Sequence, residues 1–359
     1  MRRDHAVVVF AEAAMLDRIS QRLLTLLQFT RMALVFTAIS NSLCTLLLAT
    51  RGEVGPDGSV LRALDWQRPV LVALISIGLY GYGMTLNDII DRRRDRQLAA
   101  HRPLPSGRIA LATAHVVCGL LILMAVVAGA LYAKRSPGGW MSLVLVLWTA
   151  FLIAFYDFAG KYLVAVGLLT LGLIRFFHAV IPAPELPLLW HPLLLFTHVS
   201  VLSAVAYWWE EKRPPLTVSH WWAVLGGMGM IDILAISIVW WVGRGGEAAG
   251  GLGWRPGLLL PLGLAALFVI VAWRIKRKSA TPRQAGQTLM LTGLLWLIAY
   301  DSAFVGVYVG KRYALALLLL LPLSYLMVLL MRWWSKLLSL SQPPEYKRVR
   351  SSAEVQGQP

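Results

Sequence analysis

The chain has 359 residues, of which 58% are apolar and only 14% are charged, and its mean hydropathy is +0.65. This composition excludes an ordinary soluble domain, in which about 25% of residues are charged, and indicates a polytopic membrane protein. The net charge of +16 does not predict a nucleic-acid partner, because the basic residues lie in loops between apolar segments and not on one soluble face.

The N-terminal segment, residues 1–22, begins with basic residues, but its apolar run is short and is interrupted by Glu12 and Asp17. We therefore expect a cytoplasmic or interfacial amphipathic helix and no cleaved signal peptide. The two cysteines, Cys44 and Cys118, lie in apolar segments without metal-ligand spacing. They predict neither a disulfide framework nor a zinc site, and we expect both to be buried apolar fillers.

A spanning helix needs about 20 mostly apolar residues, and open sheet edges cannot face lipid. The sequence therefore predicts an all-α bundle of nine or ten transmembrane helices within one domain, residues 23–340. The polar, proline-containing tail at 341–359 is expected to be disordered. The ten candidate spans are residues 29–49, 69–90, 110–132, 140–156, 162–182, 189–209, 220–242, 257–274, 287–309 and 313–332.

The distribution of Lys and Arg predicts the orientation of these spans. Most of the basic residues, including the arginines from Arg92 to Arg108, fall on one side when the N-terminus is placed inside. Both termini are then cytoplasmic, and the loops after the second, fourth, sixth and eighth spans share that side. Because no transit peptide is recognisable, we expect a multi-pass protein of a bacterial plasma membrane, surrounded by lipids. Its oligomeric state is not readable from the sequence.

The end of the second predicted span carries an acidic motif. Asp88, Asp91 and Asp95 occur at i, i+3 and i+7, so on a helix all three point the same way. A divalent cation relieves the repulsion among such carboxylates, and hard oxygen ligands suit Mg²⁺, which also binds phosphate oxygens. The spacing therefore predicts a diphosphate site bridged by metal. The alternative is that the neighbouring arginines only anchor the loop at the membrane, but this does not explain three carboxylates on one face.

The run from Asn87 to Asp95, followed by the loop Arg102-Pro-Leu-Pro-Ser-Gly-Arg-Ile109, resembles the first aspartate-rich motif and trailing loop of the UbiA superfamily of intramembrane prenyltransferases. That family includes enzymes that prenylate 4-hydroxybenzoate, chlorophyllide and haem precursors. The resemblance implies Mg²⁺-dependent transfer of an isoprenyl group from a prenyl diphosphate to a lipophilic or aromatic acceptor. It implies catalytic and metal-binding roles for Asp88, Asp91 and Asp95, and it implies nine spans where we count ten.

Other polar positions extend the predicted site. Arg31 precedes an F-T-A segment as in the family's first helix, although an arginine at the mouth of a span also snorkels. Tyr156 and Lys161 are similar to the family's Y-x-x-x-K element with one extra residue, which makes Lys161 a candidate phosphate ligand. The predicted substrate-binding residues are Asn87, Arg92, Arg96, Arg102, Lys161, Arg175, His178, Arg31 and Asn41.

Arg175 lies deep in the fifth span, where a charge is costly unless it faces a polar cavity or a partner. A cavity role and a structural pair with Asp232 or Asp301 both remain open. His178 lies on the same helix face as Arg175 and is either a site residue or an interhelical contact.

The second acidic motif departs from the family pattern. Relatives carry two or three aspartates at the cytoplasmic end of the sixth span, where a second Mg²⁺ binds, whereas this chain has Glu210 and Glu211. Adjacent residues point about 100° apart on a helix and chelate poorly. Both glutamates are candidate metal ligands, and the alternative is a charged helix end.

Three other functions compete with prenyl transfer. A CDP-alcohol phosphotransferase also uses spaced aspartates, but its D-G and A-R elements do not follow Asp95. A non-catalytic prenyl-diphosphate-binding or transport protein on the same scaffold would explain the altered second motif. A solely structural protein gives no reason for the first motif. Neither the acceptor nor the length of the prenyl chain is readable from the sequence.

Overall fold

The computed structural model describes residues 19–50, 65–100, 102–186, 188–243 and 255–340, and these are helical without a strand. Residues 19–29 form a helix ahead of the first labelled element. The labelled elements are η1 (Met32–Leu34), α2 (Val35–Thr50), α4 (Gln67–Ile90), α5 (Arg92–Leu98), α6 (Leu111–Ala133), α7 (Trp140–Phe158), η2 (Gly160–Tyr162), α8 (Val164–Val180), α9 (Trp190–Trp209), α10 (Val218–Gly243), η4 (Pro256–Leu258), α11 (Leu259–Lys278), α12 (Pro282–Tyr308), α13 (Lys311–Leu318) and α14 (Leu320–Leu340).

The predicted all-α membrane fold is confirmed. Within the described ranges, nine helices are long and apolar enough to cross a membrane, with α13 and most of α14 counted as one span. The helix α8 is also apolar but has only 17 residues. Each of the ten predicted spans therefore contains a helix. The predicted fifth span, residues 162–182, is longer than α8 at both ends, and the 3-10 turn η2 lies directly before this helix.

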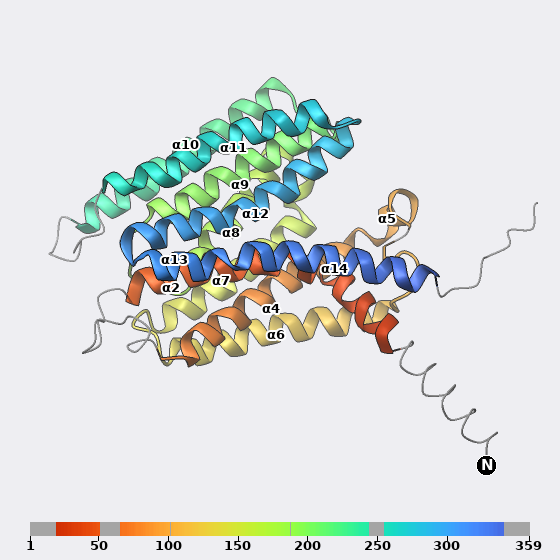
Figure 1. Ribbon diagram of the computed structural model, residues 1–359, viewed down its shortest axis with the longest axis horizontal. Helices are drawn as coiled ribbons and strands as arrows, with labels where there is room; N and C mark the ends of the chain where they lie inside the picture. The colour runs from red at the N-terminus through yellow and green to blue at the C-terminus, as the bar shows by residue number, and fades with distance from the viewer. Residues whose placement is uncertain (1–18, 51–64, 101, 187, 244–254, 341–359) are drawn as a thin grey trace, which may run out of the picture.

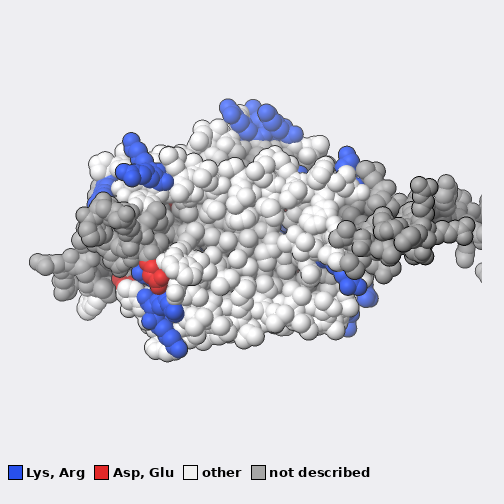
Figure 2. Space-filling view, turned by 60° about the horizontal axis from the view of Figure 1, so that its bottom comes forward, with Lys and Arg blue, Asp and Glu red and all other residues white. Residues whose placement is uncertain are grey.

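The helices lie side by side, with α10 and α11 along one margin of the bundle and α4 and α6 along another (Figure 1). In α9, 61% of the most apolar window is buried, whereas the corresponding value for α11 is 11%. Because apolar side chains need no protein cover in lipid, this difference indicates that α9 is central and that α11 faces the bilayer. Figure 2, which brings the bottom of Figure 1 forward, shows a broad uncharged surface with Lys and Arg gathered toward its edges.

Close packing between central helices depends on small residues. A Cβ added at Gly78 of α4 would lie 2.7 Å from the main-chain oxygen of Leu121 in α6. A Cβ at Gly172 of α8 would lie 2.8 Å from the main-chain oxygen of Phe196 in α9. Helix pairs in membranes associate through such small-residue contacts, because lipid supplies no hydrophobic driving force between helices.

The first described helix begins, and α14 ends, at the same end of the bundle as α5 (Figure 1). That this end is cytoplasmic stays a prediction from the Lys and Arg distribution. Most of the predicted interfacial segment at 1–22, and the whole of the predicted disordered tail at 341–359, lie outside the described residues.

Candidate active site

The three predicted aspartates share one buried face at the α4–α5 junction. Asp91 lies between the two helices, and the main-chain bonds Asp91 N–H to Asn87 O (2.9 Å) and Asp95 N–H to Asp91 O (2.8 Å) carry the helical register across it. Asp88, Asp91 and Asp95 are 3%, 5% and 4% exposed, while Arg93 on the opposite face is exposed. The i, i+3, i+7 spacing thus aims three carboxylates into the protein.

Cations from three other parts of the chain meet this face. Arg31 Nη2 lies 2.9 Å from Asp88 Oδ1, and Lys161 Nζ lies 2.7 Å from Asp91 Oδ1. Arg102 Nη1 lies 2.5 Å from Asp95 Oδ2 and 3.8 Å from Asp88 Oδ1. Buried carboxylates of this kind need compensating charge, and each has it.

Arg31 reaches the site from an unusual backbone conformation. Its φ of 50° and ψ of 37° fall in the left-handed region, which non-glycine residues seldom adopt. This conformation separates the helix at residues 19–29 from η1. At this break in the helix, the side chain of Arg31 pairs with Asp88. The strained backbone conformation therefore occurs at a residue that contacts the site.

The structure adds two residues that the sequence interpretation did not assign to the site. Asp157 at the end of α7 is 1% exposed, and its Oδ1 lies 3.7 Å from Lys161 Nζ. Arg94 Nη2 pairs with Asp91 Oδ2 at 2.7 Å. The i, i+4 spacing of Asp157 and Lys161 was the available signal for the first of these, and the i, i+3 spacing of Asp91 and Arg94 was the signal for the second.

Three of the predicted substrate-binding residues are placed as follows. The Asn87 side chain faces the carboxylates, and with its amide nitrogen toward them it donates to Asp157 Oδ1 at 3.0 Å and to Asp91 Oδ2 at 3.3 Å. Arg92 is half-buried and Arg96 is exposed. Among the contacts that the described residues make, neither arginine forms an ion pair with the aspartates, so their roles stay predictions.

Mg²⁺ fits the donor set, because it takes one or two carboxylates together with phosphate and water oxygens. The carboxylate oxygens of the three aspartates do not all lie within 4.8 Å of one another. In the described part of the chain, the one group of at least three His, Cys, Asp or Glu residues with ligand atoms within 4.8 Å of one another is Cys44, His191 and Asp301. Metal binding at Asp88, Asp91 and Asp95 therefore requires their side chains to exchange arginine and lysine partners for the ion.

The second acidic position differs from the first in its surroundings. Glu210 follows α9 directly, and its Oε2 lies 3.1 Å from Lys212 Nζ. Glu211 has a φ of 51°, so the helix has ended before it. The Glu210 side chain also packs on α12, where a Cβ added at Gly286 would lie 2.4 Å from Glu210 Cγ. This geometry matches a helix-end ion pair, and a metal at these glutamates stays a prediction.

Arg175 belongs to a polar chain inside the bundle. Its Nη1 and Nη2 donate to Asn41 Oδ1 (3.2 Å) and Thr37 Oγ1 (3.3 Å). Asn41 Nδ2 donates in turn to Asp301 Oδ2 at 2.8 Å. Arg175 is half-buried and is connected to Asp301 through the Asn41 amide and not by a direct pair, and a cavity role for Arg175 stays a prediction.

His178 lies at an interhelical contact. It is 4% exposed, and its Nδ1 is 3.5 Å from Ser42 Oγ on α2, which also accepts from Ser76 Oγ of α4 at 3.1 Å. A hydroxyl-imidazole cluster joining three helices is the kind of contact that holds membrane helices together. A substrate role for His178 stays a prediction.

The family comparison settles the scaffold. The UbiA prenyltransferase family matches residues 42–298, which is well over half of the chain. The chain belongs to this family. The match ends before α13 and α14, so the tenth helix lies beyond it, and it begins after Arg31 and Asn41. No curated protein matches the chain.

Solved structures are similar to this chain, and the one with a TM-score above 0.5 shows the same fold. One, described as giving structural and mechanistic insights into digeranylgeranylglyceryl phosphate synthase in membranes, has 18% identity and a TM-score of 0.53, and covers 80% of this chain and 99% of its own. A UbiA homolog from Archaeoglobus fulgidus has 15% identity and a TM-score of 0.46 over 79% of this chain and 100% of its own. A UbiA homolog from Archaeoglobus fulgidus bound to GPP and Mg²⁺ has 14% identity and a TM-score of 0.41, and covers 88% of this chain and 99% of its own.

Proposed function

We propose that this UbiA-family membrane protein is a Mg²⁺-dependent prenyltransferase that moves an isoprenyl group from a prenyl diphosphate to a lipophilic or aromatic acceptor. The observation that carries the proposal is the buried face of Asp88, Asp91 and Asp95, surrounded by Arg31, Arg102 and Lys161. Carboxylates alone suit a metal and cations alone suit an anion. Their combination at the end of an apolar bundle suits a metal-bound diphosphate with an apolar tail.

The three aspartates would hold Mg²⁺, which supplies electrostatic stabilisation of the leaving diphosphate when bound. The arginines and the lysine now paired with the aspartates would turn to the diphosphate oxygens, for which the guanidinium fork is well shaped. In the transfer, the bond between the allylic carbon and the diphosphate oxygen breaks, a bond forms from that carbon to the acceptor, and the acceptor loses a proton. The apolar bundle interior keeps water away from the carbon as it gains positive charge.

Lys161 has a distinct part in this scheme. It is the most buried of the cations, with a side chain 9% exposed, and it lies between Asp91 and Asp157. The carboxylate of Asp157 would keep the ammonium charged and in place when Asp91 turns to the metal. A point charge held in a dry site is an effective partner for developing negative charge.

A non-catalytic prenyl-diphosphate-binding or transport protein is the second candidate function. The observation that favours it is the engagement of Glu210 by Lys212, at a position where the family resemblance implies a second metal. This candidate uses the same first site but predicts binding without turnover.

The two candidates are separated by measuring diphosphate release from prenyl diphosphates of graded length, with the full chain purified in detergent and supplied with Mg²⁺ or with a chelator. Asp91→Asn tests the site, and Asp65→Asn is a matched control because Asp65 is exposed and remote from α5. Magnesium-dependent release lost only in Asp91→Asn supports the enzyme. Magnesium-dependent binding without release, for every chain length and in the presence of a panel of acceptors, supports the binding protein instead.

A further inference from the structure

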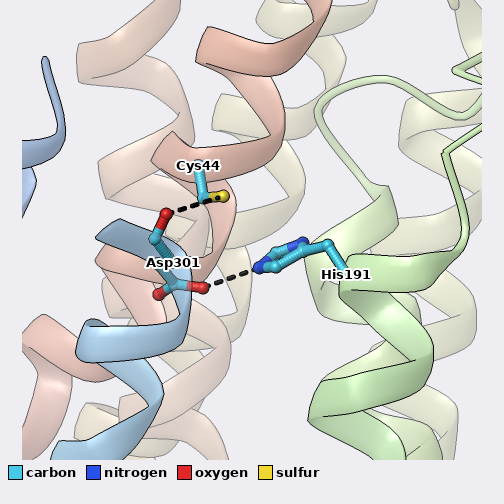
Figure 3. Close-up of side chains that lie close together, drawn as sticks. All are labelled: Cys44, His191 and Asp301. Carbon is cyan, nitrogen blue, oxygen red and sulfur yellow. Dashed lines mark hydrogen bonds and ion pairs between the residues drawn. The ribbon is translucent and has the colours of Figure 1, made fainter. Parts of the chain in front are cut away.

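We propose that Cys44, His191 and Asp301 form a buried binding site for a zinc-type divalent ion, separate from the magnesium site proposed at the aspartates. Figure 3 shows the three side chains converging from α2, α9 and α12. Their ligand atoms all lie within 4.8 Å of one another, a property that no other group of His, Cys, Asp and Glu shares within the described residues. This proposal departs from the expectation that Cys44 is an apolar filler outside any zinc site. That expectation rested on ligand spacing, which is not diagnostic when the ligands lie on three separate helices.

The site is enclosed. Cys44 and Asp301 are 0% exposed and His191 is 1% exposed. It lies where α9 begins and α12 nears its end, away from α5 (Figure 1). The helix α2 begins at Val35, close in sequence to Arg31, which contacts the aspartate face. Cys44 is nine residues further along α2, which corresponds to about 13 Å at the helical rise. The cluster is therefore a second polar region within the bundle and not part of the aspartate face.

The charge of Asp301 is one reason to place an ion here. Its carboxylate accepts from Asn41 Nδ2 at 2.8 Å and contacts His191 Nε2 at 2.6 Å. Among the described ion pairs, no Lys or Arg reaches this carboxylate, and Arg175 is connected only through the Asn41 amide. A divalent ion bound by a thiolate, a neutral imidazole and a carboxylate has no net charge, so it removes the cost of burying the carboxylate alone.

The Cys44 thiol and the His191 imidazole have atoms that could bind a metal ion and that form weak hydrogen bonds or none. Cys44 Sγ makes only a 3.5 Å contact with the main-chain oxygen of Asp301, which is a weak bond for a thiol. His191 Nδ1 is buried without a hydrogen-bond partner. The thiol and the imidazole are thus more weakly satisfied than buried polar groups usually are.

The carboxylate is already oriented as a metal ligand. Asn41 holds Oδ2, which leaves Oδ1 directed toward His191 and the interior of the cluster. Hydrogen bonds from a neighbouring side chain to the far oxygen of a ligating carboxylate are a common feature of metal sites. Asn41 is itself held by Arg175.

The donor set selects the ion. One thiol, one imidazole and one carboxylate are zinc ligands, whereas Mg²⁺ prefers oxygen donors throughout. In a tetrahedral zinc site, ligand atoms lie roughly 3.5 Å apart, given bonds of about 2.0 to 2.3 Å. The 2.6 Å contact between His191 Nε2 and Asp301 Oδ1 must therefore open on binding. The Cys44 thiol gives up its proton to solvent, and the imidazole stays neutral by carrying its proton on the ring nitrogen that does not bind the ion. The bound ion would tie α2, α9 and α12 together.

The test is metal analysis of the full chain purified in detergent without chelator. We expect about one zinc ion per chain by mass spectrometry of the elements, which is lost in Cys44→Ser and in His191→Gln. Cys118→Ser is the matched control, since Cys118 is also buried but lies on α6, and it should keep the ion. After removal of zinc by chelator, Co²⁺ should give the charge-transfer absorption of a thiolate ligand in the native chain and in Cys118→Ser, but not in Cys44→Ser.

A second measurement keeps the test decisive if the variants fail to fold. In the native chain, chelation should lower the thermal midpoint and Zn²⁺, but not Mg²⁺, should restore it. Absence of stoichiometric zinc, no thiolate-to-cobalt band and a midpoint insensitive to chelator would overturn the proposal. The cluster would then be a hydrogen-bonded contact between helices. Neither measurement depends on prenyl transfer, so this inference and the proposed function can fail separately.

Discussion

Replacement of Lys161 by Gln tests the electrostatic reasoning at the candidate active site. Lys161 Nζ is 2.7 Å from Asp91 and 3.7 Å from Asp157, and these carboxylates are 6% and 2% exposed. Removing one partner of a buried ion pair costs about 3 to 5 kcal/mol, because it leaves an uncompensated charge. Asp91 keeps its pair with Arg94, but this arginine is 58% exposed and compensates the carboxylate charge less than the buried Lys161 does. We therefore expect Lys161→Gln to lower the free energy of unfolding by about 3 kcal/mol.

Two comparisons sharpen this prediction. Lys161→Gln combined with Asp157→Asn should recover part of the loss, with a coupling energy of about 1 to 3 kcal/mol, because both charges of that contact are then absent. Mg²⁺ should raise the thermal midpoint of Lys161→Gln more than that of the native chain, since a divalent ion at Asp91 replaces the missing positive charge.

The assay is thermal unfolding in detergent, with and without Mg²⁺, followed by titration with a prenyl diphosphate. Lys161→Gln should also weaken diphosphate binding by roughly tenfold, which corresponds to about 1.4 kcal/mol. Lys161→Arg controls for the loss of charge. The reasoning is refuted if Lys161→Gln leaves both the midpoint and the affinity unchanged, or if its effect simply adds to that of Asp157→Asn.

Three further predictions concern other contacts. Arg102→Gln removes the partner of two buried carboxylates and should lower prenyl diphosphate affinity about tenfold. Arg93→Gln, at an exposed position on the opposite face, should change that affinity less than twofold, and equal losses in a binding titration would contradict this placement. Glu210→Gln should lower the free energy of unfolding by less than about 1 kcal/mol and leave diphosphate release unchanged, because Glu210 forms an ion pair at a helix end. A large loss of diphosphate release that excess Mg²⁺ restores would instead indicate that Glu210 is a metal ligand. Gly78→Val should destabilise the protein by about 1 to 3 kcal/mol or more in thermal unfolding, because the main chain of α6 cannot move away; an unchanged midpoint would show that α4 and α6 are not packed this closely.

Much of the fold could be predicted from the sequence because lipid imposes a simple rule. Every backbone polar group in the hydrocarbon region must be paired locally, so a long apolar run becomes a helix. All ten predicted spans contain helices for this reason. The fifth span was predicted too long, since hydropathy does not detect the 3-10 turn η2 that places Lys161 beside Asp91.

The candidate site was partly readable for a similar reason. The face shared by Asp88, Asp91 and Asp95 depends only on helical period, which is a local property. The choice of Arg94 over Arg92 and Arg96 as the partner of Asp91 follows from the i, i+3 spacing in the same way. By contrast, the sequence contains no measure of the packing that brings Arg31 to Asp88 and Lys161 to Asp91.

By itself, the sequence determined that the chain is a helical membrane protein, that three carboxylates share one helix face, and that its motifs resemble the UbiA family. These properties follow from composition, period and order along the chain. Only the tertiary structure decided that Asp157 joins the site and that Arg175 reaches Asp301 through Asn41. It also decided that Cys44 meets His191 and Asp301. Such contacts join residues on different helices, and their distances are set by how the helices pack and not by their spacing in sequence.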